Sequence, residues 1–143
     1  MMKLSTKGRY GVTAMYDLAL NIGKGPVSLK SVAERQMISE HYLEQLMGQL
    51  RKAGLVKSTR GSLGGYILTK EPQEITVGDI IRVMEGPIAP VDCILSKEKD
   101  DFHYCAKSGQ CVTKGVWMRV AASIEDVLDN ITLADLCKEE MNK

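Results

Sequence analysis

The sequence predicts a mainly α-helical protein with a small β-hairpin wing, arranged as a winged helix-turn-helix followed by a long C-terminal dimerisation helix. Apolar residues make up 44% of the 143 residues but aromatic residues only 5%, so the core must consist of aliphatic side chains, which favour helices. Two short helical patterns separated by a tight connection precede a glycine-rich hairpin. A long apolar stripe at helical spacing then appears near the C-terminus.

The first two predicted helices are separated by a glycine- and proline-containing turn. Residues 7–22 form the first helix, with an apolar stripe made of Val12, Met15, Leu18, Ala19 and Ile22. Gly23 and Pro26 end this helix, since glycine frees the backbone and proline cannot continue the hydrogen-bond ladder. Ser28 is placed to cap a second helix, which extends to about Gln36.

The third predicted helix has one apolar and one polar face. Ser39 caps it, and it ends at Gly54. Its inward face is expected to contain Leu43, Leu46, Met47 and Leu50. Its outward face contains His41, Gln45, Gly48 and Lys52, with Glu44 on the flank.

A hairpin follows the third helix. Residues 55–58 and 66–69 have strand-like composition, and the segment 59–65 between them contains three glycines and Arg60. Two helices joined by a short turn and followed by a two-stranded hairpin make a winged helix. Thr76 and Asp79 then predict a capping box at the start of a fourth helix.

The C-terminal part predicts a long helix over residues 114–131 and a short last helix capped by Thr132. The long stripe exceeds what one small winged helix can cover, so a twofold pair of such helices is expected to bury it. We expect Trp117 to be a buried anchor of this helix. The expected units are a winged helix-turn-helix domain at 1–87, a cysteine-bearing loop at 88–113, and the dimerisation and C-terminal helices at 114–143.

The distribution of charge suits a polyanionic partner for the first half of the chain. Residues 1–75 carry 11 basic against 6 acidic residues, a net charge of +5, whereas the remainder carries −4. The sequence contains no apolar targeting stretch and no segment long enough to span a bilayer. We therefore expect a cytoplasmic protein, in which cysteines are normally reduced.

The third helix and the hairpin tip present groups that can read duplex DNA. Glu44 can accept a hydrogen bond from cytosine, Gln45 can pair with adenine and His41 can donate to guanine. Arg60 can enter a narrow minor groove. The candidates for phosphate contacts are Lys7, Arg9, Tyr42 and Lys57. The alternative is a three-helix protein-interaction domain with an ordinary solvated helix face.

Three cysteines lie in the segment between the fourth and fifth helices. Cys93, Cys105 and Cys111 follow the spacing C-x11-C-x5-C. Thiolates are soft ligands that suit iron–sulfur clusters and zinc; the alternatives are half-buried thiols or an occasional disulfide. His103 is the nearest imidazole. We expect Cys137, in the last helix, to be a small core residue.

Four stretches resemble the iron–sulfur cluster regulator family, whose branches include IscR-type, NsrR-type and CymR-type proteins. They are residues 4–11, 38–46, 50–56 and 60–66, and the similarity extends over nearly the whole chain. The resemblance implies a homodimeric bacterial transcription regulator that binds promoter DNA. It also implies base or sugar contacts from the positions of Ser39, His41, Glu44, Arg60 and Gly61.

The resemblance further implies a 2Fe–2S cluster held by Cys93, Cys105 and Cys111. In IscR-type members a histidine three residues after the last cysteine completes the ligand set, and here that position is Lys114. The acidic ligand of the NsrR branch corresponds to Arg9. His103 is therefore the candidate fourth ligand. We expect the cluster to control promoter binding at genes for iron–sulfur cluster biogenesis or related stress responses.

Two other functions compete with a cluster-dependent regulator. Residues 86–92 are similar to the CymR branch, which lacks these cysteines and acts with a partner enzyme, so a cluster-free regulator of cysteine metabolism is the main alternative. A zinc-stabilised interaction module is the second. The sequence has neither a C-x-x-C pair nor an evident set of convergent acids and bases, so we expect no enzymatic activity.

Overall fold

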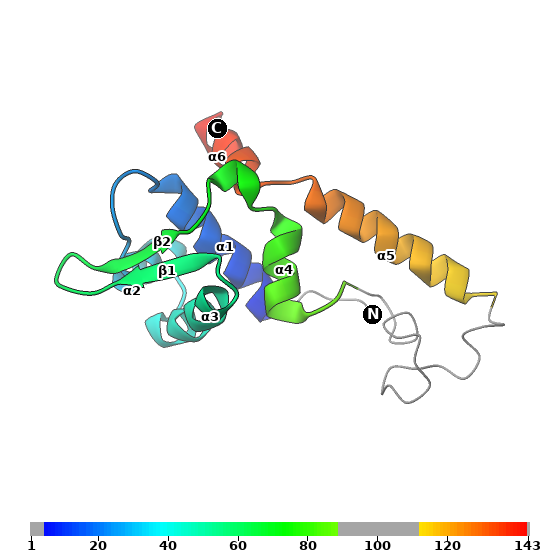
Figure 1. The fold of residues 1–143 in the computed structure, drawn as a ribbon, viewed down its shortest axis with the longest axis horizontal. Coiled ribbons are helices and arrows are strands. Elements are labelled where there is room, and N and C mark those ends of the chain that lie inside the picture. Colours follow the sequence, from blue (N-terminus) through cyan, green and yellow to red (C-terminus); the bar gives the residue numbers. More distant parts are fainter. Residues whose placement is uncertain (1–4, 89–111, 143) are drawn as a thin grey trace.

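The computed structural model describes residues 5–88 and 112–142. Within these ranges the chain folds into a winged helix-turn-helix unit from which one long helix extends (Figure 1). In chain order the elements are α1 (Thr6–Leu20), α2 (Leu29–Gln36), α3 (Glu40–Lys52), β1 (Val56–Thr59), β2 (Gly65–Leu68), the 3-10 turn η1 (Pro72–Glu74), α4 (Val77–Glu85), α5 (Lys114–Asp129) and α6 (Leu133–Met141).

Side-chain caps begin the helices where the sequence predicts them. The Ser28, Ser39 and Thr76 hydroxyls accept from backbone N–H groups three residues later, at 3.2, 3.1 and 3.0 Å. The first helix departs from the prediction, because Ser5 caps it one residue early and Asn21 ends it. Ile22 consequently lies beyond α1 and is exposed instead of buried.

The turn between α2 and α3 has an unusual backbone. Met37 adopts the left-handed conformation, with φ 55° and ψ 46°, and its N–H donates to the carbonyl of Ala33. A side chain in this conformation costs about 1 kcal/mol relative to glycine. The turn orients α3 across α2, and Ile38 beside it is buried in the core.

The wing is a hairpin with an extra bridge to the segment before α2. β1 and β2 pair antiparallel, with Val56 opposite Leu68 and Thr59 opposite Gly65. Each strand is displaced by one residue from its predicted position. Val27 adds a bridge to Tyr66 through two backbone hydrogen bonds of 2.9 and 2.8 Å. This contact, which the sequence did not predict, ties the base of the wing to the helical body.

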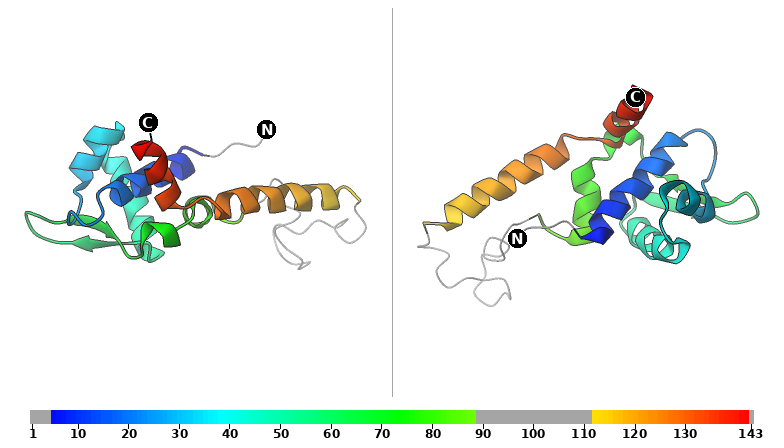
Figure 2. Two further views of the ribbon diagram at one scale, coloured as in Figure 1. Left: turned by 90° about the horizontal axis from the view of Figure 1, so that it is seen from above. Right: turned by 180° about the vertical axis from the view of Figure 1, so that it is seen from behind.

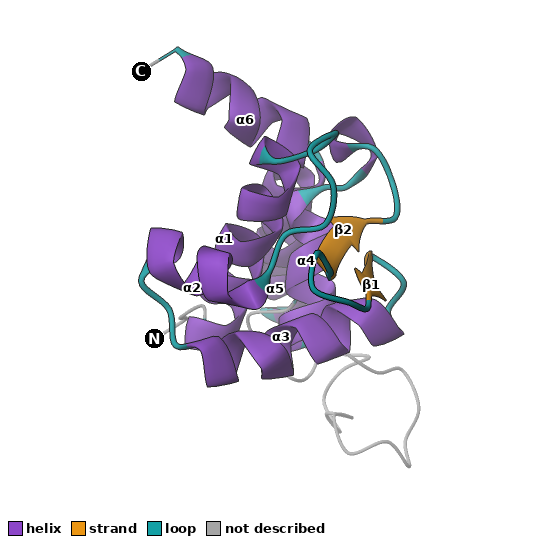
Figure 3. Cartoon of the chain, turned by 90° about the vertical axis from the view of Figure 1, so that its left-hand side faces the viewer, coloured by secondary structure: helices purple, strands orange, loops and turns teal. Residues whose placement is uncertain are grey.

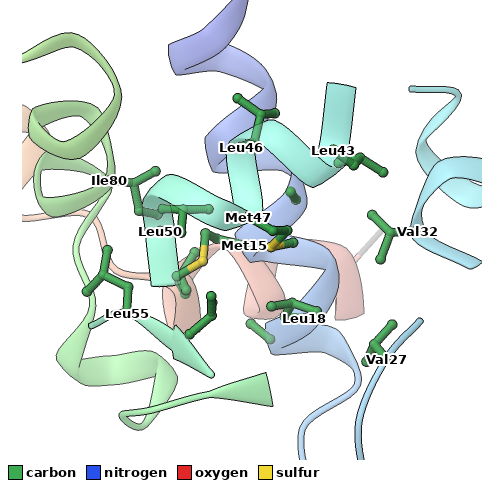
Figure 4. Packing of buried hydrophobic residues seen from close by; sticks show 14 of the residues in the cluster. Met15, Leu18, Val27, Val32, Leu43, Leu46, Met47, Leu50, Leu55 and Ile80 are labelled. Atoms are coloured by element: carbon green, nitrogen blue, oxygen red, sulfur yellow. The ribbon is translucent and has the colours of Figure 1, made fainter. Parts of the chain in front are cut away.

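The core consists of aliphatic and methionine side chains, as the composition predicts. Figure 4 shows side chains from α1, α3 and α4 meeting those of the wing base. The buried residues of this core include Met15, Leu18, Val32, Leu43, Leu46, Met47, Leu50, Leu55 and Ile80. Close packing of this kind fixes the orientation of α3, the helix that carries the outward polar face.

The long helix α5 extends away from the winged unit (Figure 2). Ala121 is the only one of its sixteen residues that is buried. Trp117 is 38% exposed, so the prediction that it is a buried anchor is wrong for the single chain. The reason is that no neighbouring element within the described residues covers the N-terminal half of α5.

The C-terminal end of α5 is held by the winged unit. The Val77 N–H donates to the Ile131 carbonyl at 2.8 Å, and the Leu133 N–H donates to Ile75 at 3.0 Å. A two-point ion pair joins Arg82 to Asp129, and the guanidinium lowers the pKa of that carboxyl. Helix α6 then packs on α1 and η1. Among the described residues, no helix has the length and hydropathy needed to cross a membrane.

Candidate nucleic-acid interface

Helix α3 lies at the outside of the winged unit, with α1 and α2 against its inner side (Figure 3). The predicted inward residues Leu43, Leu46, Met47 and Leu50 are all buried, which confirms the assignment of that face. Helical geometry then directs His41, Glu44 and Gln45 outward, and all three are exposed. The exposed polar face therefore has hydrogen-bonding groups on two successive turns.

Two of these side chains contact each other. The Nε2 atoms of His41 and Gln45 lie 3.4 Å apart, one helical turn from each other. A neutral imidazole can donate or accept at this atom, so the His41 tautomer determines whether the Gln45 amide donates to it. The two residues thus present a linked pattern of donors and acceptors.

Ser39 has a structural role in addition to the predicted contact with DNA. Its hydroxyl oxygen accepts from the backbone N–H of Tyr42 and so fixes the first turn of α3. The hydroxyl proton remains able to donate outward, because accepting one hydrogen bond leaves the donor function of the group intact. Ser39 can therefore cap the helix and contact a phosphate or base at the same time.

The beginning of α1 contacts the first turn of α3 through aromatic rings. The Tyr10 and Tyr42 rings meet edge to face, with centroids 5.9 Å apart and an interplanar angle of 81°. The Arg9 guanidinium lies 6.0 Å from the centre of the Tyr10 ring. Arg9, Tyr42 and the partly exposed Lys7 are thereby brought to one end of the recognition helix. Sequence reasoning grouped these three residues as phosphate contacts but did not predict the ring contact that joins their helices.

The wing tip presents Arg60 and Gly61 to solvent. Gly61 has a φ of 108°, a conformation that a side chain would strain. The Gly64 N–H donates to the Gly61 carbonyl at 3.0 Å and closes a tight turn. Arg60 is therefore carried on a defined hairpin end, as the predicted hairpin requires.

A buried carboxylate that the sequence analysis did not single out lies behind this interface. Asp17 in α1 is 1% exposed and accepts from Arg35 at 3.0 and 2.7 Å and from Gln36 at 2.9 Å. The hydrogen bond to Asp17 raises the pKa of Arg35 above its ordinary value. An acidic residue next to Leu18, within a helix whose apolar stripe includes Met15 and Leu18, was the available signal. The network fixes α1 against α2, the two helices that support α3.

The cysteine constellation falls outside the described residues. Cys93, Cys105, Cys111 and His103 all lie between positions 89 and 111. Within residues 5–88 and 112–142, no group of three or more histidine, cysteine or acidic side chains is arranged to hold a metal ion. Cys137 is half-buried against the core, as predicted, and burial raises the pKa of its thiol.

Comparison with known proteins gives consistent matches along the chain. Residues 4–139 match the Rrf2 family, described as "Iron-dependent Transcriptional regulator". The chain is 51% identical over 135 residues to the HTH-type transcriptional regulator CymR of Bacillus subtilis, covering 94% of this chain and 89% of that protein. It is 44% identical over 139 residues to the HTH-type transcriptional regulator IscR of Sodalis glossinidius, and the match covers 97% of this chain and 81% of that protein.

Solved structures give the same two kinds of relative. CymR, the global cysteine regulator of B. subtilis, superimposes with a TM-score of 0.77 at 50% identity and covers 97% of this chain and 98% of its own. IscR of T. potens superimposes with a TM-score of 0.76 at 57% identity, and the superposition covers 97% of this chain and 88% of the T. potens chain. These similarities confirm the winged-helix fold class.

Proposed function

The chain belongs to the Rrf2 family of transcriptional regulators, and from this premise we propose that it binds promoter DNA as a cytoplasmic homodimer whose affinity depends on an iron–sulfur cluster. Its named relatives are regulators and not enzymes, in agreement with the sequence analysis. The observation that carries the proposal is the exposed polar face of α3 beside a wing that ends in Arg60.

The proposed contacts with DNA follow from this geometry. Helix α3 enters the major groove, where His41, Glu44 and Gln45 contact base edges. The wing places Arg60 and Gly61 at the adjacent minor groove. The phosphate and sugar contacts fall to Lys7, Arg9, Ser39 and Tyr42. Binding of this kind weakens steeply with added salt, because each neutralised phosphate releases counterions.

The exposed apolar residues of α5 support the homodimer. Val116 and Val127 are 51% and 57% exposed and lie eleven residues apart, which places them on one face of the helix. Exposed apolar residues that share one helix face are typical of an interaction surface. A second copy of α5 covers it, and the twofold axis sets two α3 helices about 34 Å apart on a near-palindromic site.

The donor set of residues 93–111 suits an iron–sulfur cluster. Three cysteine thiolates are the soft ligands such clusters take, and His103 is the candidate for the fourth position. When bound, a 2Fe–2S cluster would change its charge with its redox state, and the fraction of protein that holds it would depend on oxidants and on iron supply. The segment joins α4 to α5, and Arg82 and Asp129 also connect these helices. A change in this segment can therefore alter the placement of the recognition helices relative to the dimer axis.

A cluster-free regulator of cysteine metabolism is the second candidate. The similarity to CymR proteins favours it, since one relative with this name is 51% identical to the chain. On this alternative the three cysteines carry no cluster, and a partner protein adjusts promoter binding. A zinc site on the same thiolates is the corresponding alternative for the metal.

Anaerobic purification tests the cluster directly. Visible absorption with iron and sulfide assays on the purified protein is expected to report a cluster. The triple variant Cys93→Ala, Cys105→Ala, Cys111→Ala is expected to lose it, and Cys137→Ala serves as the matched control that retains it. Colourless protein containing zinc, or containing no metal, would contradict the cluster.

Promoter binding is then measured with duplexes selected by the wild-type protein from a randomised library. The cluster-loaded protein and the triple variant are expected to prefer different duplexes or to bind the same ones with different affinity. Identical affinities for every selected duplex would rule out control by the cluster while leaving DNA binding intact.

A further inference from the structure

The wing tip carries a large apolar side chain that the fold does not use. Leu63 is 88% exposed. Because the Gly64 N–H donates to the Gly61 carbonyl, Ser62 and Leu63 are the two central residues of the turn. Glycine, asparagine, aspartate and serine are the usual residues at such a position, and none of them exposes so much apolar surface. Leu63 therefore stabilises neither the turn nor the core.

Close backbone contacts fix the position of the hairpin that carries this side chain. A Cβ atom on Gly64 would lie 2.1 Å from the Thr59 carbonyl oxygen, and one on Gly65 would lie 2.3 Å from that of Val27. The backbone of Gly64 therefore lies directly against that of Thr59, and the backbone of Gly65 directly against that of Val27. The Val27–Tyr66 bridge lies next to the second of these contacts. In Figure 1 the hairpin end is the most distant part of the winged unit from α5.

A polar hollow of about 300 Å³ lies directly beside Leu63. Its lining includes the cationic residues Lys24 and Arg35 and the hydroxyl-bearing residues Ser28, Ser31 and Ser62. Arg35 keeps 45% of its side chain exposed although it is paired with Asp17, and Lys24 is exposed. The wing tip thus places an apolar side chain next to positive charge and hydrogen-bond donors.

We propose that Leu63 inserts into the minor groove beside Arg60 and that Lys24 contacts the sugar–phosphate strand on the side of the hollow. The minor groove is about 6 Å wide, so a side chain on its floor has a phosphate strand close on either side. Apolar side chains are used in this groove to pack on sugars and to wedge between base steps. The inference rests on the proposed function, since it requires that the wing meets DNA.

The two residues have separable effects on binding. Leu63→Ser is expected to lower affinity for a selected duplex about 5- to 30-fold with an unchanged salt dependence, because an apolar contact releases no counterions. Lys24→Gln is expected to lower affinity and to reduce the slope of log affinity against log salt by about one. Met141→Ser, at the exposed end of α6 far from the wing, is the matched control and is expected to bind like the wild type.

Replacing base pairs in the DNA segment that the wing contacts tests whether Leu63 occupies the floor of the minor groove. The A·T pairs there are replaced by G·C or by inosine·C pairs, which differ in the minor groove only by the guanine amino group. The wild type is expected to bind the inosine duplex better than the G·C duplex, because that amino group occupies the groove floor. Leu63→Ser is expected to lose most of this difference.

The outcomes separate the inference from the proposed function. Wild-type protein that binds no duplex at low salt would overturn both. Wild-type protein that binds, together with a Leu63→Ser variant of equal affinity and equal discrimination, would overturn the role of Leu63 and leave the regulator intact. Both substituted positions are exposed to solvent, so the circular dichroism spectra and unfolding temperatures of the two variants are expected to match those of the wild type.

Discussion

Two regions of this molecule have the same sequence pattern and different surroundings. Helices α1 and α5 both contain apolar residues at helical spacing, but α1 buries Ala14, Met15, Leu18 and Ala19 whereas α5 buries Ala121 alone. Figure 2 shows the cause, since α1 lies among the other helices and α5 projects from them. The pattern of a helix therefore predicts that a partner exists, and the fold decides whether that partner lies in the same chain.

The same contrast applies to the two arginine–aspartate pairs. Arg35 with Asp17 and Arg82 with Asp129 both form two hydrogen bonds, each with a shortest distance of 2.7 Å. Asp17 is buried, but Asp129 is 40% exposed and Arg82 37%. Water reaches both members of the second pair, whereas the Asp17 carboxylate of the first is shielded from solvent although Arg35 is 45% exposed. Equal geometry should therefore have unequal effects on stability.

The largest effect is expected from charge on the exposed face of α5. In the double variant Val116→Glu, Val127→Glu, two carboxylates replace apolar side chains on one face and cannot be covered by a second copy. We expect a monomer by analytical ultracentrifugation and a loss of operator affinity of about 100-fold or more, because each half-site then binds alone. Ala122→Glu adds a charge on another face of α5 and is expected to remain dimeric. A double variant that still dimerises would move the dimer contact to another surface.

The next effect concerns the buried Asp17 carboxylate in the winged unit. Asp17→Ala removes the carboxylate that accepts from Arg35 and Gln36, and leaves these donors without their partner. Loss of one member of a buried, hydrogen-bonded pair is strongly destabilising, and the half-exposed Arg35 can recover water, so we expect a loss of about 2–3 kcal/mol. Urea unfolding followed by circular dichroism measures this change. A loss below about 0.5 kcal/mol would mean that the network contributes only orientation.

Local features of the winged unit were predictable from the sequence. The caps at Ser28, Ser39 and Thr76 and the buried face of α3 follow from residues within one or two helical turns. The candidate base-contacting residues His41 and Gln45 could be placed on the outer face of α3 for the same reason. Their contact with each other was not predictable, because side-chain rotamers decide it.

The remaining features depend on residues far apart in the chain. The Val27–Tyr66 bridge, the burial of Asp17 and the contact of α6 with α1 arise when separate segments meet. Trp117 illustrates the opposite error: its place in an apolar stripe suggested burial, but nothing in the described part of the chain covers it. The cysteine site was predicted by spacing and resemblance, and it remains a prediction.

A smaller effect is expected at the contact that returns α6 to the winged unit. The Tyr16 hydroxyl donates to Glu140 at 2.9 Å, and burial together with this hydrogen bond raises the pKa of Tyr16 from 10.0 to about 12. The folded pKa lies above the unfolded value, so the contribution to stability is complete below pH 10 and is lost as the pH rises through about 12. In an ultraviolet titration of the folded protein, Tyr16→Phe is expected to remove the most alkaline phenolate step. Persistence of that step in the variant would assign it to another tyrosine.

The smallest effect is expected at the exposed pair between α4 and α5. Asp129→Ala breaks two hydrogen bonds to Arg82, but both side chains are already in water and exchange these bonds for solvent. We therefore expect the free energy of unfolding to stay within the error of a urea titration, in contrast to Asp17→Ala. A loss as large as that of Asp17→Ala would contradict this expectation. Because the pair is exposed in the single chain, such a loss would mean that a second copy buries it and that the dimer contact extends to the C-terminal end of α5.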